Sequence, residues 1–92
     1  MRTMNRYTFR FQIGFLDTET KEGLTMREAK DYALYRAKIS GDGKCFVHGY
    51  NEKLFKWEHL FDMYKEGYFI NSFGDRCWYK QPQSEHDEAA SL

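Results

Sequence analysis

The chain has 92 residues, enough for one domain, and its 14 Lys and Arg residues balance its 14 Asp and Glu residues. This balance argues against a strongly acidic nucleic-acid mimic and against a polybasic nucleic-acid binder. The 17 aromatic residues (eight Phe, seven Tyr and two Trp) exceed what one small core hides easily. We therefore expect some at the surface, where Tyr and Trp are enriched in protein interfaces.

The composition also argues against a membrane or secreted protein. No apolar run approaches the roughly 18 residues needed to span a bilayer, and MRTMNRYTF carries charge without the apolar stretch of a signal peptide. We expect a cytoplasmic protein with no membrane partner, in which Cys45 and Cys77 are reduced thiols.

The first predicted element is a strand at residues 7–16, YTFRFQIGFL, where apolar and aromatic residues occupy the odd positions. Strand side chains alternate between faces, so the odd set is predicted to be buried and Arg10 to point outward. The polar segment DTETKEG that follows is predicted to be a connection of turn-forming residues.

A helix is predicted to begin at Thr25, because Thr25-Met26-Arg27-Glu28 fits the S/T-x-x-E capping box. Met26, Ala29, Ala33 and Ala37 are spaced three and four apart on one face, and the alanines would let this helix lie close to a sheet. The segment SGDG, residues 40–43, is expected to end it.

Residues 44–50, KCFVHGY, are predicted to form the next strand. A second helix is predicted from Asn51 as its cap to about residue 66, with Gly67 just beyond its end. The spacing of three and four that indicates this helix is carried by Leu54, Trp57, Leu60, Phe61 and Tyr64.

The segments YFINSF and RCWYK are predicted to form a hairpin around Gly74-Asp75. The fold predicted for residues 1–80 is a single α+β domain, with a four-stranded, mixed or mostly antiparallel sheet and two helices on one face, in the order β-α-β-α-β-β. Residues 81–92 are predicted to be a disordered acidic tail, and without it the body is mildly basic.

The pattern of Cys and His residues does not indicate a metal site or a nucleophile. Cys45 and His48 differ by three positions, which places them on opposite faces of a strand, whereas tetrahedral zinc needs convergent ligands. The segment GDGK lacks the Ser or Thr and the glycine spacing of a phosphate-binding loop. We predict a protein that is not an enzyme, with no catalytic residue, metal or cofactor.

A basic and aromatic surface is predicted where the strands face away from the helices. The predicted interface residues are Arg10, Lys44, Phe46, His48, Tyr50, Arg76, Trp78 and Lys80. A shift of one residue in strand phase would instead turn these side chains into ordinary core. Such a surface suits single-stranded RNA, whose bases stack on rings, or a protein groove that takes the rings as anchors. A secondary interface is predicted at Arg27, Lys30, Tyr35 and Phe55.

In format, a domain of this size with surface aromatics such as those in FKWEHLF and RCWYK resembles the small bacteriophage anti-CRISPR proteins. The resemblance implies an inhibitor that acts in the host cytoplasm and binds a CRISPR effector complex of the multisubunit type I class. Contacts with Cas subunits and guide RNA would then block target DNA recognition. The alternative is a small RNA- or DNA-binding regulatory module that uses the same sheet face.

Overall fold

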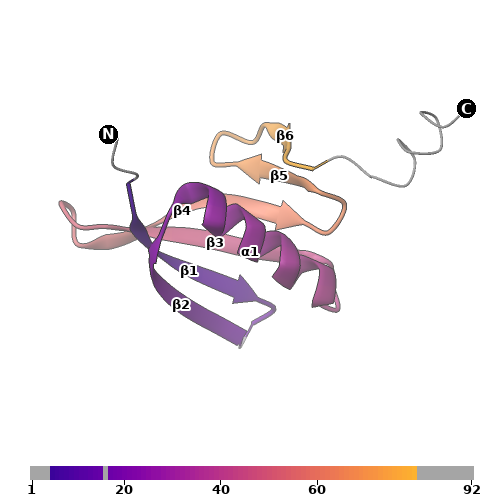
Figure 1. Cartoon of the computed structure of the whole chain (residues 1–92), viewed down its shortest axis with the longest axis horizontal. Helices are drawn as coiled ribbons and strands as arrows, with labels where there is room; N and C mark the ends of the chain where they lie inside the picture. The colour runs from indigo at the N-terminus through magenta and orange to yellow at the C-terminus, as the bar shows by residue number, and fades with distance from the viewer. Residues whose placement is uncertain (1–4, 16, 81–92) are drawn as a thin grey trace, which may run out of the picture.

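The computed structural model describes residues 5–15 and 17–80, and shows one helix on one face of a six-stranded antiparallel sheet (Figure 1). The strands lie in the order β2-β1-β3-β4-β5-β6. The predicted fold of four strands and two helices is therefore wrong in both numbers. The elements are β1 (Tyr7–Ile13), β2 (Asp17–Leu24), α1 (Met26–Ile39), β3 (Lys44–Asn51), β4 (Lys56–Tyr64), β5 (Tyr68–Asn71) and β6 (Arg76–Trp78).

The predicted capping box and first helix are confirmed. The Thr25 backbone N–H donates to Glu28 Oε1 at 2.8 Å, and the Glu28 backbone N–H donates to Thr25 Oγ1 at 3.1 Å. The buried alanines of α1 bring it close to the sheet, where it contacts β3 and β4 more than β1 and β2. This capping box satisfies backbone N–H groups at the N-terminus of α1 and so fixes the residue at which the helix begins.

The predicted second helix is wrong, because its residues form a hairpin arm and strand β4. Asn51 is therefore not a helix cap: its Oδ1 accepts hydrogen bonds from the backbone N–H groups of Lys53 and Leu54, each at 3.0 Å, within the turn between β3 and β4. No helix follows, since Phe55 takes the left-handed conformation at φ 54° and the chain turns back. Strand β4 then pairs with β3 along its length.

A bulge in β4, together with apolar side chains on both faces of this strand, explains the misleading spacing. Val47 pairs with Phe61 and His48 pairs with His59, so Leu60 is an extra residue in the ladder. Leu60 packs against the core beside Phe61, which places two neighbouring residues on the helix side. Trp57 and Tyr64 lie on the opposite face of β4, so apolar residues from both faces combine into the spacing of three and four that is typical of a helix.

The segment predicted to be a polar connection is the edge strand β2. Asp17 and Glu19 lie on its helix side and pair with Arg36 of α1, with Oδ2 and Oε1 at 2.7 and 3.2 Å from the guanidinium nitrogens. Tyr32 donates its hydroxyl proton to Glu19. Polar sequence and inward-facing charges are typical of an exposed sheet edge, where they oppose pairing with another chain.

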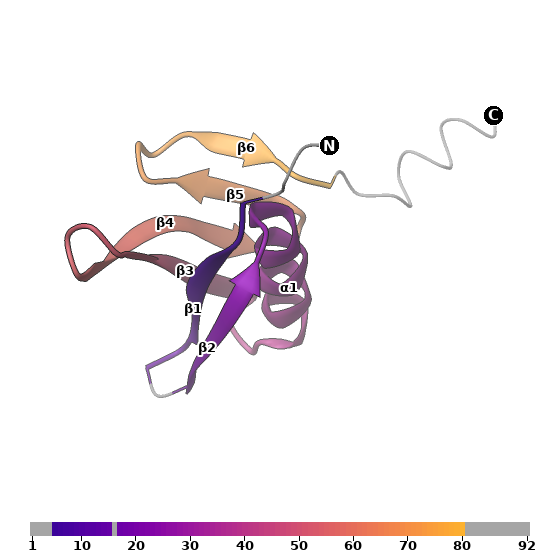
Figure 2. The same ribbon diagram turned by 60° about the vertical axis from the view of Figure 1, so that its left-hand side comes forward.

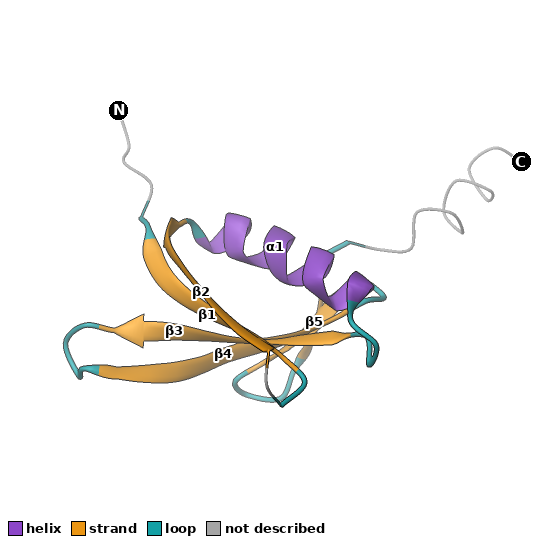
Figure 3. Cartoon of the chain, turned by 90° about the horizontal axis from the view of Figure 1, so that it is seen from below, coloured by secondary structure: helices purple, strands orange, loops and turns teal. Residues whose placement is uncertain are grey.

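The core lies between α1 and the sheet, and the opposite face of the sheet carries no helix in the described part of the chain (Figures 2 and 3). Phe9 and Phe11 of β1 are buried as predicted, whereas Tyr7 at the start of the strand is 45% exposed and Phe15 beyond its end is 97% exposed. Within the described ranges, no helix is long and apolar enough to cross a membrane. The predicted tail at residues 81–92 lies outside the described residues.

The candidate functional site is the bare face of the sheet

We call the sheet surface opposite α1 the bare face. Cys45 and Val47 of β3 are fully buried beneath α1, so the residues that alternate with them, including Phe46 and His48, lie on the bare face. This is the strand phase that the sequence analysis assigned to residues 44–50. Figure 3 shows the helix layer on one side of the sheet only.

The register places bare-face residues in rows that run across the strands, because residues paired directly share a face. The first row pairs Tyr50 with Trp57, and the second joins Arg10, His48 and His59. The third row holds Gln12, Phe46, Asp62, Ile70 and Arg76, and the fourth holds Lys44, Tyr64, Tyr68 and Trp78.

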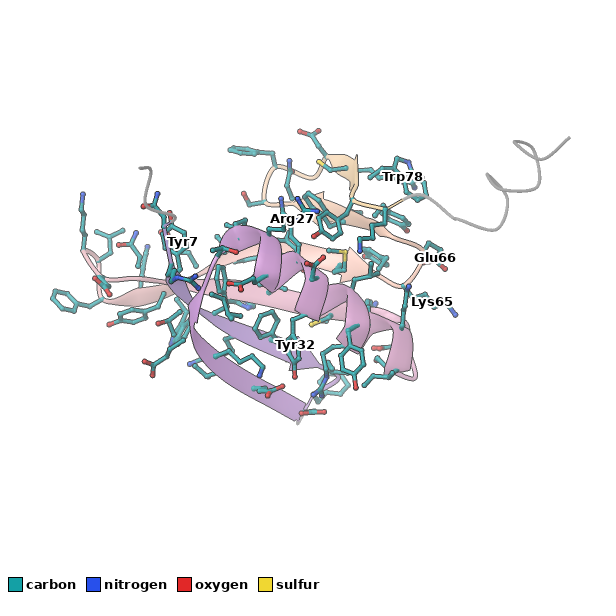
Figure 4. The ribbon with its side chains drawn as sticks, viewed as in Figure 1. Tyr7, Arg27, Tyr32, Lys65, Glu66 and Trp78 are labelled. Carbon is teal, nitrogen blue, oxygen red and sulfur yellow. The ribbon has the colours of Figure 1, made fainter. Side chains whose placement is uncertain are left out.

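The rings of the first and fourth rows contact one another. Tyr50 and Trp57 meet edge to face, with ring centroids 5.2 Å apart. Tyr64 and Tyr68 are stacked at 4.9 Å, and Trp78 meets Tyr68 edge to face at 5.4 Å. Trp78 keeps 47% of its surface exposed at the edge strand β6 (Figure 4). These contacts hold the rings in place and leave their outer surfaces for a partner.

Three cations lie over rings of the bare face. The guanidinium carbons of Arg10 and Arg76 lie 4.0 Å and 4.6 Å from the ring centroids of Trp57 and Tyr68, and Lys44 Nζ lies 5.7 Å from that of Phe46. Among residues 5–15 and 17–80, none of the three forms an ion pair with a carboxylate. Their charges therefore remain available to an anionic group of a partner.

Two histidines occupy the middle of the bare face. The rings of His48 and His59 meet edge to face at 5.4 Å, and His59 Nε2 lies 2.6 Å from Asp62 Oδ1. His48 Nδ1 is buried and makes no hydrogen bond to any described residue. Burial lowers the pKa of His48, and the nearby His59 and Arg10 lower it further. A neutral His48 is thus favoured while the face is uncovered.

The structure separates Lys80 from the other predicted interface residues. Its Nζ lies 3.9 Å from Asp31 Oδ1 of α1, on the helix side of the sheet. The other seven residues lie in the four rows of the bare face.

The predicted secondary interface is divided between two elements. Arg27, Lys30 and Tyr35 belong to α1, whereas Phe55 lies in the loop between β3 and β4. Lys30 is partly buried, with Nζ 4.8 Å from the ring centroid of Phe69, and Tyr35 is 57% exposed.

Sequence analysis missed three rings of the bare face, namely Trp57, Tyr64 and Tyr68. Trp57 and Tyr64 were assigned to the predicted second helix. Tyr68 was placed in a strand of the predicted hairpin, but its side chain was assigned to neither face of the sheet. The preference of aromatic residues for strands was the available signal.

The proposed separation of Cys45 from His48 agrees with the structure, which places them on opposite faces of β3. No group of three metal-ligating side chains occurs among the described residues. Burial raises the pKa of Cys45 to about 12, so this thiol stays protonated at neutral pH.

A pocket of about 560 Å³ lies on the helix side, between the start of β1, the start of α1 and the hairpin formed by β3 and β4. Phe9 and Leu60 contribute apolar surface, Glu22, Glu52 and Glu58 contribute carboxylates, and Arg6 and Lys53 contribute cations. The lining of this pocket is therefore of mixed charge.

No known protein family, curated protein sequence or solved structure matches the chain. The function proposed below therefore depends on the geometry of the bare face and on the resemblance in format described above.

Proposed function

We propose that the protein is a non-enzymatic inhibitor that binds a CRISPR effector complex through its bare face and blocks target DNA recognition. The observation that carries this proposal is the set of three cations, Arg10, Lys44 and Arg76, each lying over a ring without an ion pair among the described residues. Rings beside unpaired cations suit a partner that offers apolar surface and anionic groups together.

The residue types of the bare face support a protein partner. Trp, Tyr and Arg are the most frequent energetic anchors of interfaces, and both the first and the fourth rows combine Trp and Tyr with an adjacent Arg. A multisubunit type I complex would offer Cas side chains to the rings and guide-RNA phosphates to the cations. We propose that this binding takes place in the cytoplasm of the host cell.

The fourth row favours a second function, a small RNA- or DNA-binding regulatory module. Tyr64, Tyr68 and Trp78 are adjacent rings on three neighbouring strands, with Lys44 at the end of the row. Rings beside cations are the surface on which single-stranded nucleic acid stacks. Free RNA would then bind without any Cas protein.

Binding to a purified type I effector complex tests the inhibitor proposal. We expect the wild-type chain to bind the complex and to prevent its binding of target DNA. Trp78→Ala should weaken binding by about 2 kcal/mol, or roughly 30-fold. Phe15→Ala, which removes an exposed ring in the loop between β1 and β2, is the matched control and should bind like the wild type.

Two results would contradict the inhibitor proposal. One is a wild-type chain that does not bind the complex, and the other is a folded Trp78→Ala variant with unchanged affinity. Titration with free single-stranded RNA at two salt concentrations tests the second function. Tight binding to RNA that weakens steeply with salt would favour the regulatory module.

A further inference from the structure

The loop between β3 and β4 carries an exposed apolar tip. The two strands form an arm that extends beyond α1 (Figures 1 and 3). At its end Leu54 is 57% exposed and Phe55 is 80% exposed, between Lys53 and Lys56. We call residues 53–56 the arm tip. Two large apolar side chains in solvent at the end of a hairpin are available for contact with another molecule.

Hydrogen bonds hold the arm tip in one conformation. Asn51 Oδ1 accepts from the backbone N–H groups of Lys53 and Leu54, and Asn51 Nδ2 donates to Glu58 Oε1 at 3.1 Å. The paired rings of Tyr50 and Trp57 lie directly behind the tip on the bare face. The apolar side chains are therefore presented on a preorganised loop, which lowers the entropy lost on binding.

Phe55 has a backbone conformation that disfavours its own side chain. Its φ is 54°, the left-handed region in which glycine is free of strain and an aromatic residue is not. A ring that is 80% exposed contributes little to the core, so glycine would form the same turn at lower cost. Strain of this kind is frequent at functional sites. A contact with a partner explains why an aromatic residue stands here.

We propose that the arm tip is an anchor that inserts Leu54 and Phe55 into an apolar pocket of the protein subunit covered by the bare face. This inference rests on the proposed function, because it assigns a second contact to the same partner. Tyr50 and Trp57 belong to both the arm and the bare face, so a partner on the first row reaches the tip.

The mixed charge of the arm around its tip favours a protein pocket over phosphates or lipid. Lys53 and Lys56 are balanced by Glu52 and Glu58 of the same arm, so residues 52–58 have no net charge. Nucleic acids and anionic membranes attract polybasic segments, whereas an apolar centre with a mixed-charge rim is typical of a protein interface.

The variant Phe55→Gly separates binding from stability. Because glycine tolerates this φ, the variant should melt at the same temperature as the wild type or a few degrees higher. Its Kd for the effector complex should rise about tenfold or more. Phe15→Ser is the matched control: Phe15 is 97% exposed in the loop between β1 and β2 and should leave the Kd within about twofold.

The outcomes of this experiment are distinguishable. If the wild-type chain does not bind the complex, the proposed function is overturned and the anchor with it. If the wild type binds and Phe55→Gly binds equally well, the anchor alone is overturned. A second experiment is sedimentation with phosphatidylserine vesicles. If the chain binds these vesicles and the binding requires Phe55, the protein pocket is overturned in favour of lipid.

Discussion

The guanidinium carbon of Arg10 lies 4.0 Å from the ring centroid of Trp57, which joins β1 to β4 across the intervening strand β3. No backbone ladder connects β1 directly with β4. The contact between Arg10 and Trp57 therefore links these two strands through side chains on the bare face. The contact links Arg10 of the second row to Trp57 of the first row, where Trp57 also meets Tyr50. It is therefore a structural contact of the free protein as well as part of the proposed interface.

A double-mutant cycle should detect this contact. We expect Arg10→Met and Trp57→Leu to show a coupling free energy of about 0.5–1 kcal/mol in urea unfolding, the size of a cation–π contact near the surface. Arg10→Met combined with Trp78→Leu is the control, since Trp78 lies on β6, three strands beyond β3 in the sheet order, and should be additive. Additive effects in the Arg10 and Trp57 cycle would contradict the contact.

Gly67 is predicted to be intolerant of any side chain. A Cβ atom at this position would lie 1.8 Å from the Lys80 carbonyl oxygen, and φ is 106°. We expect Gly67→Ala to lower the free energy of unfolding by at least about 2 kcal/mol, because the backbone must move and the residue is strained. Chemical denaturation measures this change.

The matched control for Gly67 is Gly14→Ala. Gly14 also has a positive φ, 66°, but a Cβ there meets no heavy atom within 4 Å. We expect a cost of about 1 kcal/mol, due to the backbone conformation alone. If the two alanine variants lose the same free energy of unfolding, the close approach of the Lys80 carbonyl to Gly67 contributes nothing to the destabilisation.

The two cysteines should react at very different rates. Cys45 is fully buried and its pKa is raised to about 12, whereas Cys77 is partly exposed. At pH 8 a thiol-specific reagent should modify Cys77 first and Cys45 only as fast as the protein unfolds. The Cys77→Ser variant should lose the fast phase. A fast phase that persists in this variant would contradict the burial of Cys45.

His48 should make stability depend on pH. Its pKa is lowered in the folded state from the ordinary 6.5, first by burial and then by His59 and Arg10. The unfolded chain therefore binds the proton first as pH falls. The stability contributed by neutral His48 is fully present above about pH 7 and is lost as pH falls through 6.5 toward the lowered pKa.

Unfolding measured between pH 5 and pH 7.5 tests this dependence. The His48→Gln variant should show a flatter profile than the wild type, because glutamine does not titrate. Proton titration of the His48 imidazole by NMR gives its pKa directly. A value at or above 6.5 in the folded protein would contradict the expected direction.

Local chemistry made several elements predictable. The reciprocal bonds of Thr25 and Glu28 need only residues of one turn, so the start of α1 follows from four residues. The alternation of Cys45 and Val47 with Phe46 and His48 likewise follows from strand geometry. The hairpin of β5 and β6 is also present, although its loop spans residues 72–75 instead of two residues.

The sequence by itself determined the capped helix and the strand phase of β3, because each depends on neighbours in the chain. Only the tertiary structure decided which secondary structure the residues after Asn51 form. Phe55 turned the chain back, and pairing with β3 offered ladder hydrogen bonds. The helical spacing of that strand comes from apolar side chains on both of its faces together with the bulge at Leu60. The polar edge strand β2 likewise exists through its pairing with β1 and its ion pairs with α1, which no local pattern encodes.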